Sequence, residues 1–137
     1  MYLTNPRNVG VSVAEPLDDF WSRVFECVGI ADTDYSVESF VDGQKIRAYF
    51  NSHSYRVDPS VGLFRRWLEC FEGLVLDTEF QVSSCSDDLH RIFLHQAVLS
   101  ALTVAMIDSE RIRILPPSYS YPYNLNAAVH PNAERRC

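Results

Sequence analysis

Residues 87–106, DDLHRIFLHQAVLSALTVAM, decide the fold, because they combine helical spacing with apolar residues on nearly every side. Either Asp87 or Asp88 can cap the free backbone amides at the start of a helix. Two rows follow at spacings of three and four: Leu89, Ile92, Phe93, Gln96, Leu99, Ser100, Thr103 and Met106, and then Leu94, Val98, Ala101, Leu102 and Ala105. A helix that is apolar nearly all round is buried on most faces. We therefore expect it at the centre, between layers or against another subunit.

Two more stretches have the spacing of amphipathic helices. The first runs from Pro16 to Val28, ends at Gly29, and has its apolar face at Leu17, Phe20, Trp21, Val24, Phe25 and Val28. The second opens at Pro59 with Ser60 as its cap, and its buried stripe is expected at Leu63, Phe64, Trp67, Leu68, Phe71, Leu74 and Val75. Residues 77–86 are polar and are predicted to form a loop.

Short alternating segments predict strands between and after these helices. Residues 9–14 and 111–115 each have this pattern, and a hairpin is predicted from 35–41 and 45–50 around the Asp42-Gly43 turn signal. A short helix over 37–42 competes with the first hairpin arm, since its apolar residues also fit helical spacing. We expect an α/β or α+β fold with a small mixed sheet packed by about three helices. One domain is predicted over 1–137, with an irregular tail rich in Tyr and Pro from about 116 to 137.

Composition narrows the classes of partner and compartment. The net charge is -6 and the chain has one Lys, which argues against nucleic acid as the main partner. We expect no signal peptide and no membrane span. The four cysteines are far apart in the sequence, which favours a reducing cytoplasm, with Cys27 and Cys70 packed in helices and Cys85 and Cys137 exposed.

Three landmarks follow one another along the chain: Tyr49-Phe50-Asn51-Ser52, residues 95–100 (HQAVLS), and residues 115–119 (LPPSY). In this order and spacing they resemble the acceptor-side half of a nucleotide-sugar-dependent glycosyltransferase of the GT-A type. The resemblance covers roughly residues 6–125, and two positions depart from the family pattern. His53 stands where the family has Gly, and His95 stands where it often has Asp.

The resemblance implies a partial GT-A-like fold in which Asn51, Ser52, His95 and Gln96 contact a sugar or glycan acceptor. It also implies that the nucleotide-binding half, ending in a metal-binding Asp-x-Asp, would precede Met1. Mn²⁺ or Mg²⁺ with a nucleotide sugar would bind only if that half were supplied, so this chain alone is expected to hold no cofactor, no metal ligand and no catalytic residue.

The residues themselves leave simpler interpretations open. Asn51 and Ser52 are both common turn formers, and Gln96 could tie its helix to a nearby loop backbone. Asp32-Thr33-Asp34 has an Asp-x-Asp spacing, but a turn or helix cap accounts for it better.

Two functions are consistent with these observations. The first is a glycosyltransferase-like domain with a carbohydrate-binding surface that has no nucleotide-sugar transfer activity alone. The alternative is a non-catalytic assembly module that forms a homodimer through the apolar central helix and the Tyr-rich tail.

Overall fold

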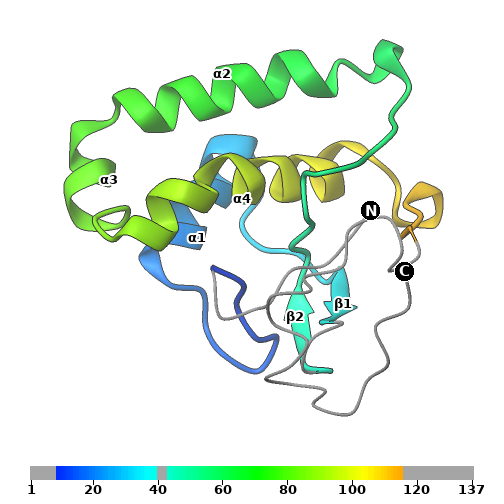
Figure 1. The fold of residues 1–137 in the computed structure, drawn as a ribbon, viewed down its shortest axis with the longest axis horizontal. Helices are drawn as coiled ribbons and strands as arrows, with labels where there is room; N and C mark the ends of the chain where they lie inside the picture. The colour runs from blue at the N-terminus through cyan, green and yellow to red at the C-terminus, as the bar shows by residue number, and fades with distance from the viewer. Residues whose placement is uncertain (1–8, 40–42, 116–137) are drawn as a thin grey trace, which may run out of the picture.

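The computed structural model describes residues 9–39 and 43–115. In this part of the chain it has four α-helices and one two-stranded antiparallel sheet, which confirms the mixed helix and strand class. The helices are α1 (Asp19–Val28), α2 (Leu63–Leu76), α3 (Thr78–Ser83) and α4 (Asp88–Met106), and the strands are β1 (Ser36–Glu38) and β2 (Lys45–Arg47). Figure 1 shows α2 along one edge, α4 through the middle and the hairpin on the other side of α4. The predicted tail at 116–137 lies outside the described residues.

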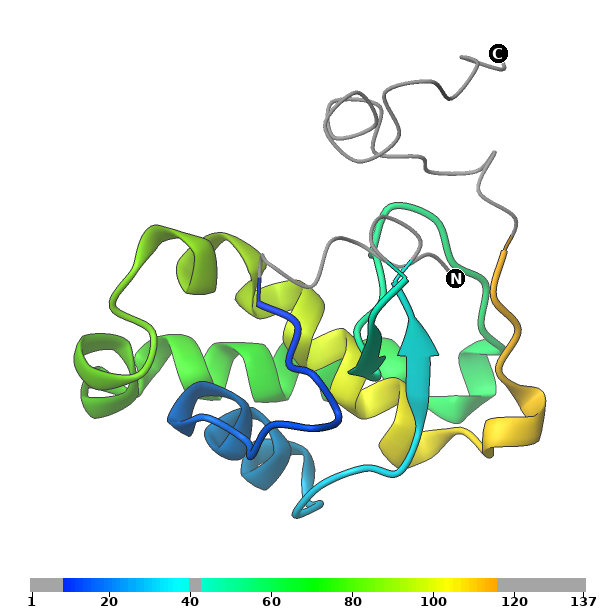
Figure 2. The ribbon, with the colours of Figure 1, turned by 90° about the horizontal axis from the view of Figure 1, so that it is seen from below.

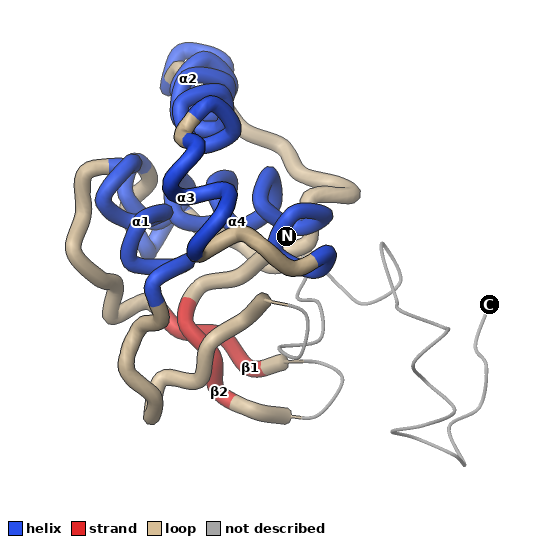
Figure 3. Tube along the Cα trace, turned by 90° about the vertical axis from the view of Figure 1, so that its left-hand side faces the viewer, coloured by secondary structure: helices blue, strands red, loops and turns tan. Residues whose placement is uncertain are grey.

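The central position expected for α4 is confirmed. Its side chains at 94 and from 96 to 103 are all buried, so the middle of the helix has no free face. It packs against both α1 and α2, as the end view in Figure 3 also shows. The helix begins where predicted, because the Asp87 carboxylate accepts a hydrogen bond from the His90 amide at 2.9 Å.

By length and composition alone, α4 could also cross a membrane, with a mean hydropathy of 1.2 over its most apolar window. Half of that window is buried within the fold. Core helices of soluble proteins pass the same test, so this is weak evidence for a span.

Helix α1 confirms the predicted apolar face and the predicted end. Its buried residues are Phe20, Trp21, Val24, Phe25 and Val28. Gly29 takes a left-handed conformation at φ 90° and closes the helix by donating its amide to Phe25 and Glu26 carbonyls. The helix begins at Asp19 rather than at Pro16, because the Asp18 carboxylate accepts the Trp21 amide at 2.8 Å and so sets the first turn.

The hairpin is confirmed over the competing helix for the residues that the structure describes. Val37 pairs with Ile46 at the centre of an antiparallel register, and Gly43 has φ 68° after the turn. Figure 2 shows the two strands beside the C-terminal half of α4. The strand predicted at 9–14 is reduced to a single bridge between Ser12 and Ile46, since the chain turns back at Ser12, whose carbonyl accepts the Glu15 amide.

Three predicted elements are wrong. Residues 77–86 contain α3 instead of a loop, because Asp77 caps the Phe80 amide at 3.0 Å and Phe80 is buried in the core. Residues 111–115 form no strand: a 3-10 turn at Ser109–Arg111 includes the first of them, and the segment has no pairing partner among the described residues. Ser60 does not cap α2: Asp58 accepts the Ser60 amide and opens a separate 3-10 turn at Pro59–Val61.

The predicted stripe of α2 is only partly buried. Leu63 and Leu74 are buried, and Trp67 and Phe71 are half-buried, whereas Phe64, Leu68 and Val75 are exposed. The stripe spans more of the helix circumference than α1 and α4 cover.

The cysteine predictions divide in a similar way. Cys70 is buried and Cys27 is half-buried, as expected, but Cys85 is fully buried rather than exposed. Its amide bonds the Phe80 carbonyl at the end of α3, which turns this residue into the core. Cys137 lies outside the described residues.

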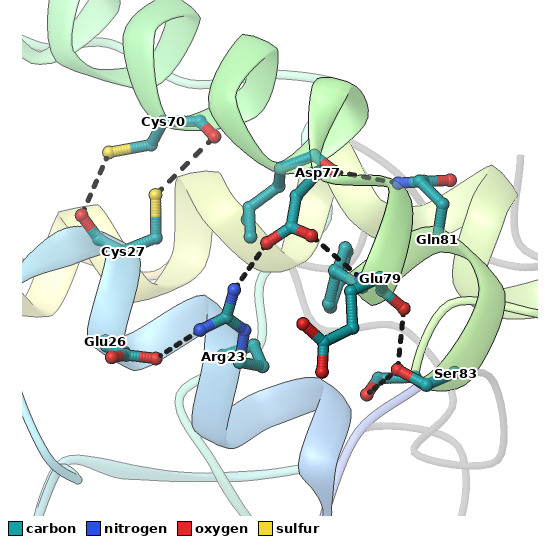
Figure 4. Close-up of polar contacts among 11 residues, drawn as sticks. Arg23, Glu26, Cys27, Cys70, Asp77, Glu79, Gln81 and Ser83 are labelled. Atoms are coloured by element: carbon teal, nitrogen blue, oxygen red, sulfur yellow. Dashed lines mark hydrogen bonds and ion pairs between the residues drawn. The ribbon is translucent and has the colours of Figure 1, made fainter.

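Polar contacts hold α1, α2 and α3 together at one junction (Figure 4). Arg23 on α1 forms an ion pair with Asp77, which separates α2 from α3, and a second ion pair with Glu26 at 2.8 Å. The thiols of Cys27 and Cys70 each bond the backbone carbonyl of the other residue, at 3.6 and 3.4 Å. The ion pair of Arg23 with Asp77 thus joins the middle of α1 to the end of α2, and the two cysteines join the end of α1 to the middle of α2.

We predict that acid weakens the fold through its caps. Hydrogen bonds from backbone amides lower the pKa values of Asp58, Asp77 and Asp87, and Arg23 lowers that of Asp77 further. The stability that these carboxylates contribute is present above the ordinary aspartate pKa of 3.8 and is lost as pH falls through the lower folded-state values. Urea unfolding between pH 6 and pH 2 should therefore show a falling free energy of unfolding.

The Asp77→Asn variant provides the control, because an amide oxygen can still cap α3 but has no charge to titrate. We expect a shallower dependence of the free energy on pH than in the unmodified chain. Identical slopes for the two proteins would exclude Asp77 as a source of the acid sensitivity.

Candidate functional site

The segment that follows β2 crosses α4 and is held there by two side chains of the helix. The backbone amide of Phe50 donates to the Ser100 hydroxyl at 2.8 Å, and the amide of Ser52 donates to Gln96 Oε1 at 3.1 Å. Gln96 and Ser100 are one helical turn apart and share a face, while Phe50 and Ser52 are two residues apart in the segment. The spacing of the two side chains along the helix matches the spacing of the two backbone amides along the segment. One face of α4 therefore binds one edge of the segment.

Gln96 is the centre of this arrangement. Its side chain is only 4% exposed, and a buried amide must be hydrogen-bonded. Its Nε2 donates to the Tyr49 hydroxyl at 2.7 Å, and its Oε1 also accepts the Ser52 hydroxyl at 3.2 Å. These contacts are those of the simpler interpretation, in which Gln96 ties the helix to a neighbouring segment.

His95 lies on the more accessible side of the same contact. Its Nε2 is 3.4 Å from the Ser52 hydroxyl, and the ring is half-buried. Its backbone carbonyl accepts Trp67 Nε1 at 2.8 Å, which fixes α2 beside this part of α4. The Ser52 hydroxyl is therefore within reach of two side chains that the sequence singled out.

Asn51 faces a different partner. Its side-chain oxygen accepts the His53 amide at 3.0 Å, so a local turn is formed, as the simpler interpretation of Asn51 and Ser52 has it. Three of the four residues, Ser52, His95 and Gln96, are thus in direct contact. Asn51 is the chain neighbour of Ser52 and is half-buried.

A cavity of about 720 Å³, which the sequence analysis did not predict, begins two residues beyond Ser52. One wall is formed by residues 54–58, including Tyr55 and Asp58, and the other by residues 107–115, including Arg111. Burial raises the pKa of the Tyr55 hydroxyl, which therefore stays protonated and able to donate. Because the two walls are some fifty residues apart in the chain, no local pattern could have revealed the cavity.

Other candidate groups have structural roles. Asp32 pairs with Arg47 at 3.0 Å and accepts the Thr33 amide at 2.7 Å, so this Asp-x-Asp stabilises a turn. Burial raises the pKa of the Cys70 thiol to about 11, with the Cys27 thiol adding to the shift, and burial also raises that of Cys85. Protonated thiols are poor nucleophiles. Within 9–39 and 43–115, no group of three or more His, Cys, Asp or Glu side chains could hold a metal ion.

No protein-family model matches the chain, and neither a curated protein nor a solved structure shows a significant similarity to it. The resemblance to glycosyltransferases therefore rests on the motifs themselves.

We predict that Ser100→Ala destabilises the fold by about 1–3 kcal/mol, because it leaves the buried amide of Phe50 without its acceptor. The matched control is Ser83→Ala on α3, which removes an exposed hydroxyl bonded to the Glu79 carbonyl and should change stability by about 0.5 kcal/mol or less. Urea unfolding measures both. Equal effects of the two substitutions would contradict the role given to Ser100.

Proposed function

We propose that this protein is a glycosyltransferase-like domain that binds carbohydrate at the surface formed by Asn51, Ser52, His95 and Gln96. On its own it does not transfer sugar from a nucleotide. The observation that supports the proposal is the shared position of the Ser52 hydroxyl, 3.2 Å from Gln96 Oε1 and 3.4 Å from His95 Nε2. Residues that are 43 and 44 positions apart thus meet where the resemblance expects an acceptor.

The chemistry of these groups suits a neutral polyol. Imidazole, hydroxyl and amide groups both donate and accept hydrogen bonds, as sugar hydroxyls do, and they carry no fixed positive charge that would select a phosphate. Gln96 is buried and already bonded to Tyr49 and Ser52, so we assign it a positioning role. Ser52, His95 and Asn51, which are partly accessible, would make the direct contacts.

The neighbouring cavity offers room for a second sugar unit. The ring of Tyr55 provides an apolar surface and a hydroxyl, and Arg56 and Asp58 add charged groups along the same wall. Pockets with apolar walls and a few convergent polar groups are the usual form of small-molecule sites. The acceptor would thus extend from Ser52 along residues 54–58.

Nucleotide-sugar binding would require a separate donor half. Transfer requires positive charge to offset the leaving diphosphate, and Mn²⁺ or Mg²⁺ held by that half would supply it. Asn51, Ser52, His95 and Gln96 would hold the acceptor only. We place the protein in the cytoplasm, because its free cysteines suit a reducing compartment.

Homo-oligomeric assembly is a second candidate function, and exposed apolar side chains favour it. Leu68 on α2 is 65% exposed, which is unusual for a leucine within an otherwise apolar row. The surface differs from the one expected, since the middle of α4 is buried. The Tyr-rich tail lies outside the described residues.

We predict that His95→Ala weakens sugar binding by about two- to tenfold, because one hydrogen bond contributes about 0.5–1.5 kcal/mol. Amide chemical shifts in ¹⁵N-labelled protein, followed during titration with monosaccharides and disaccharides, measure the affinity and locate the site. His90→Ala is the matched control on the same helix, since His90 pairs with Asp87 away from Ser52, and it should leave the affinity unchanged.

Shifts confined to residues remote from Asn51, Ser52 and His95, or no shifts at millimolar sugar, would reject the carbohydrate proposal. Equal effects of the two histidine substitutions would reject the assigned site.

A further inference from the structure

Helix α2 carries two parallel apolar rows, and the fold uses only one of them. The inner row is Leu63, Trp67, Cys70 and Leu74, of which three are 2–3% exposed and Trp67 is half-buried. The outer row is Phe64, Leu68, Phe71 and Val75, with exposures of 47% for Phe64, 65% for Leu68 and 45% for Val75. Each row has spacings of four, three and four, which is the spacing by which two helices pack along a seam.

The outer row borders α4 on the side where the segment after β2 crosses it. The Phe64 ring lies 5.5 Å from the ring of Tyr55, and the bond from Trp67 to the His95 carbonyl sets α2 beside α4. Ile92 is one turn before Gln96 on α4 and is 58% exposed. We call Phe64, Leu68, Phe71, Val75 and Ile92 together the α2 face.

This face has one covered end and one bare end. The segment through Ser52 and Tyr55 covers α4 at Gln96 and Ser100 and touches α2 at Phe64. At the other end Val75 and Ile92 are exposed. A two-fold axis through the middle of the outer row would set the covered end of each copy against the bare end of the other.

Two charged residues next to the outer row support the same arrangement. Arg65 and Glu72 are seven residues apart, on the side of α2 away from the core, and both are exposed. Neither takes part in an ion pair within the part of the chain that the structure describes. In an antiparallel helix pair, residues at this flanking position lie opposite their equivalents, so Arg65 of each copy would lie near Glu72 of the other.

We propose that two copies of this chain associate through the α2 face, with their α2 helices antiparallel. Leu68 of each copy packs against Phe71 of the other, and two symmetry-related pairs of Arg65 with Glu72 flank the seam. A second copy fits better than an unrelated helix, because both the charges and the covered and bare ends are self-complementary. The inference rests on the second candidate function, self-association, and is independent of carbohydrate binding.

Dimerisation through the α2 face would also affect the candidate carbohydrate site at Ser52 and His95. The carbonyl of His95 accepts a hydrogen bond from Trp67 of the inner row, so this residue of α4 lies beside α2. A second copy on this face would close one side of the surface formed by Ser52 and His95. Dimerisation would thus shape the entrance that an acceptor uses.

Sedimentation velocity of the full chain between 1 and 100 µM tests the proposal. We expect the unmodified protein to reach twice the chain mass of 15.7 kDa, and Leu68→Glu to stay monomeric or to weaken the dimer at least tenfold. The matched control is Leu76→Glu, because Leu76 is 72% exposed on the same helix but outside the outer row. It should leave the dimer unchanged, and both variants should keep the circular dichroism spectrum of the folded chain.

Charge reversal tests the antiparallel arrangement. Arg65→Glu or Glu72→Arg alone places like charges together twice in each dimer and should weaken it about tenfold, since exposed pairs are worth a fraction of a kcal/mol each. The double reversal should restore the affinity to within about threefold of the unmodified protein. A double variant as weak as the single ones would overturn the antiparallel pairing.

Two further outcomes distinguish a failure of self-association from a failure of this particular interface. A chain that is monomeric at 100 µM would overturn self-association together with this interface. A dimer that is insensitive to Leu68→Glu, or equally sensitive to Leu76→Glu, would overturn the α2 face while self-association itself stands.

Discussion

The position of the segment after β2 depends on two buried polar side chains of α4, Gln96 and Ser100. Burying a polar group without a partner is costly, so both side chains need hydrogen bonds, and the Ser100 hydroxyl donates one to the Gln96 carbonyl of its own helix. Both side chains also accept a hydrogen bond from the backbone of the segment after β2, Gln96 from Ser52 and Ser100 from Phe50. These two backbone bonds fix one position of the segment along α4, and the candidate site follows from that position.

The same contact connects the parts of the molecule that are important for function. Gln96 fixes Ser52 from one side, and the neighbouring residue, His95, is reached by Trp67 of α2 through its carbonyl. The segment after β2 and helix α2 therefore both contact α4 at two adjacent residues, His95 and Gln96. A surface for a small polar ligand and a surface for a second copy would be neighbours in such an arrangement.

Much of the fold could be predicted because its signals are local. The spacing of apolar residues predicted α1 and α4, Gly29 predicted the end of α1, and the turn signal before Gly43 predicted the hairpin. The contact between Ser52 and the pair His95 and Gln96 also agrees with the motifs that the sequence offered. The predictions that were wrong concern features that depend on packing. Helix α3 depends on the burial of Phe80, and the exposure of Leu68 depends on where α1 and α4 lie. The cavity beside Tyr55 joins two distant segments and has no local signal.

Amide hydrogen exchange tests the central claim most directly, because it reports the two backbone bonds that Gln96 and Ser100 accept. At neutral pH, in the folded protein, the amides of Phe50 and Ser52 should exchange far more slowly than in an unstructured peptide, although neither lies within a helix or β-strand. Gln96→Ala should remove the protection of Ser52 and retain that of Phe50. If both amides of the unmodified protein exchanged at the unstructured rate, α4 would not hold this segment, and the site built on it would have no structural basis.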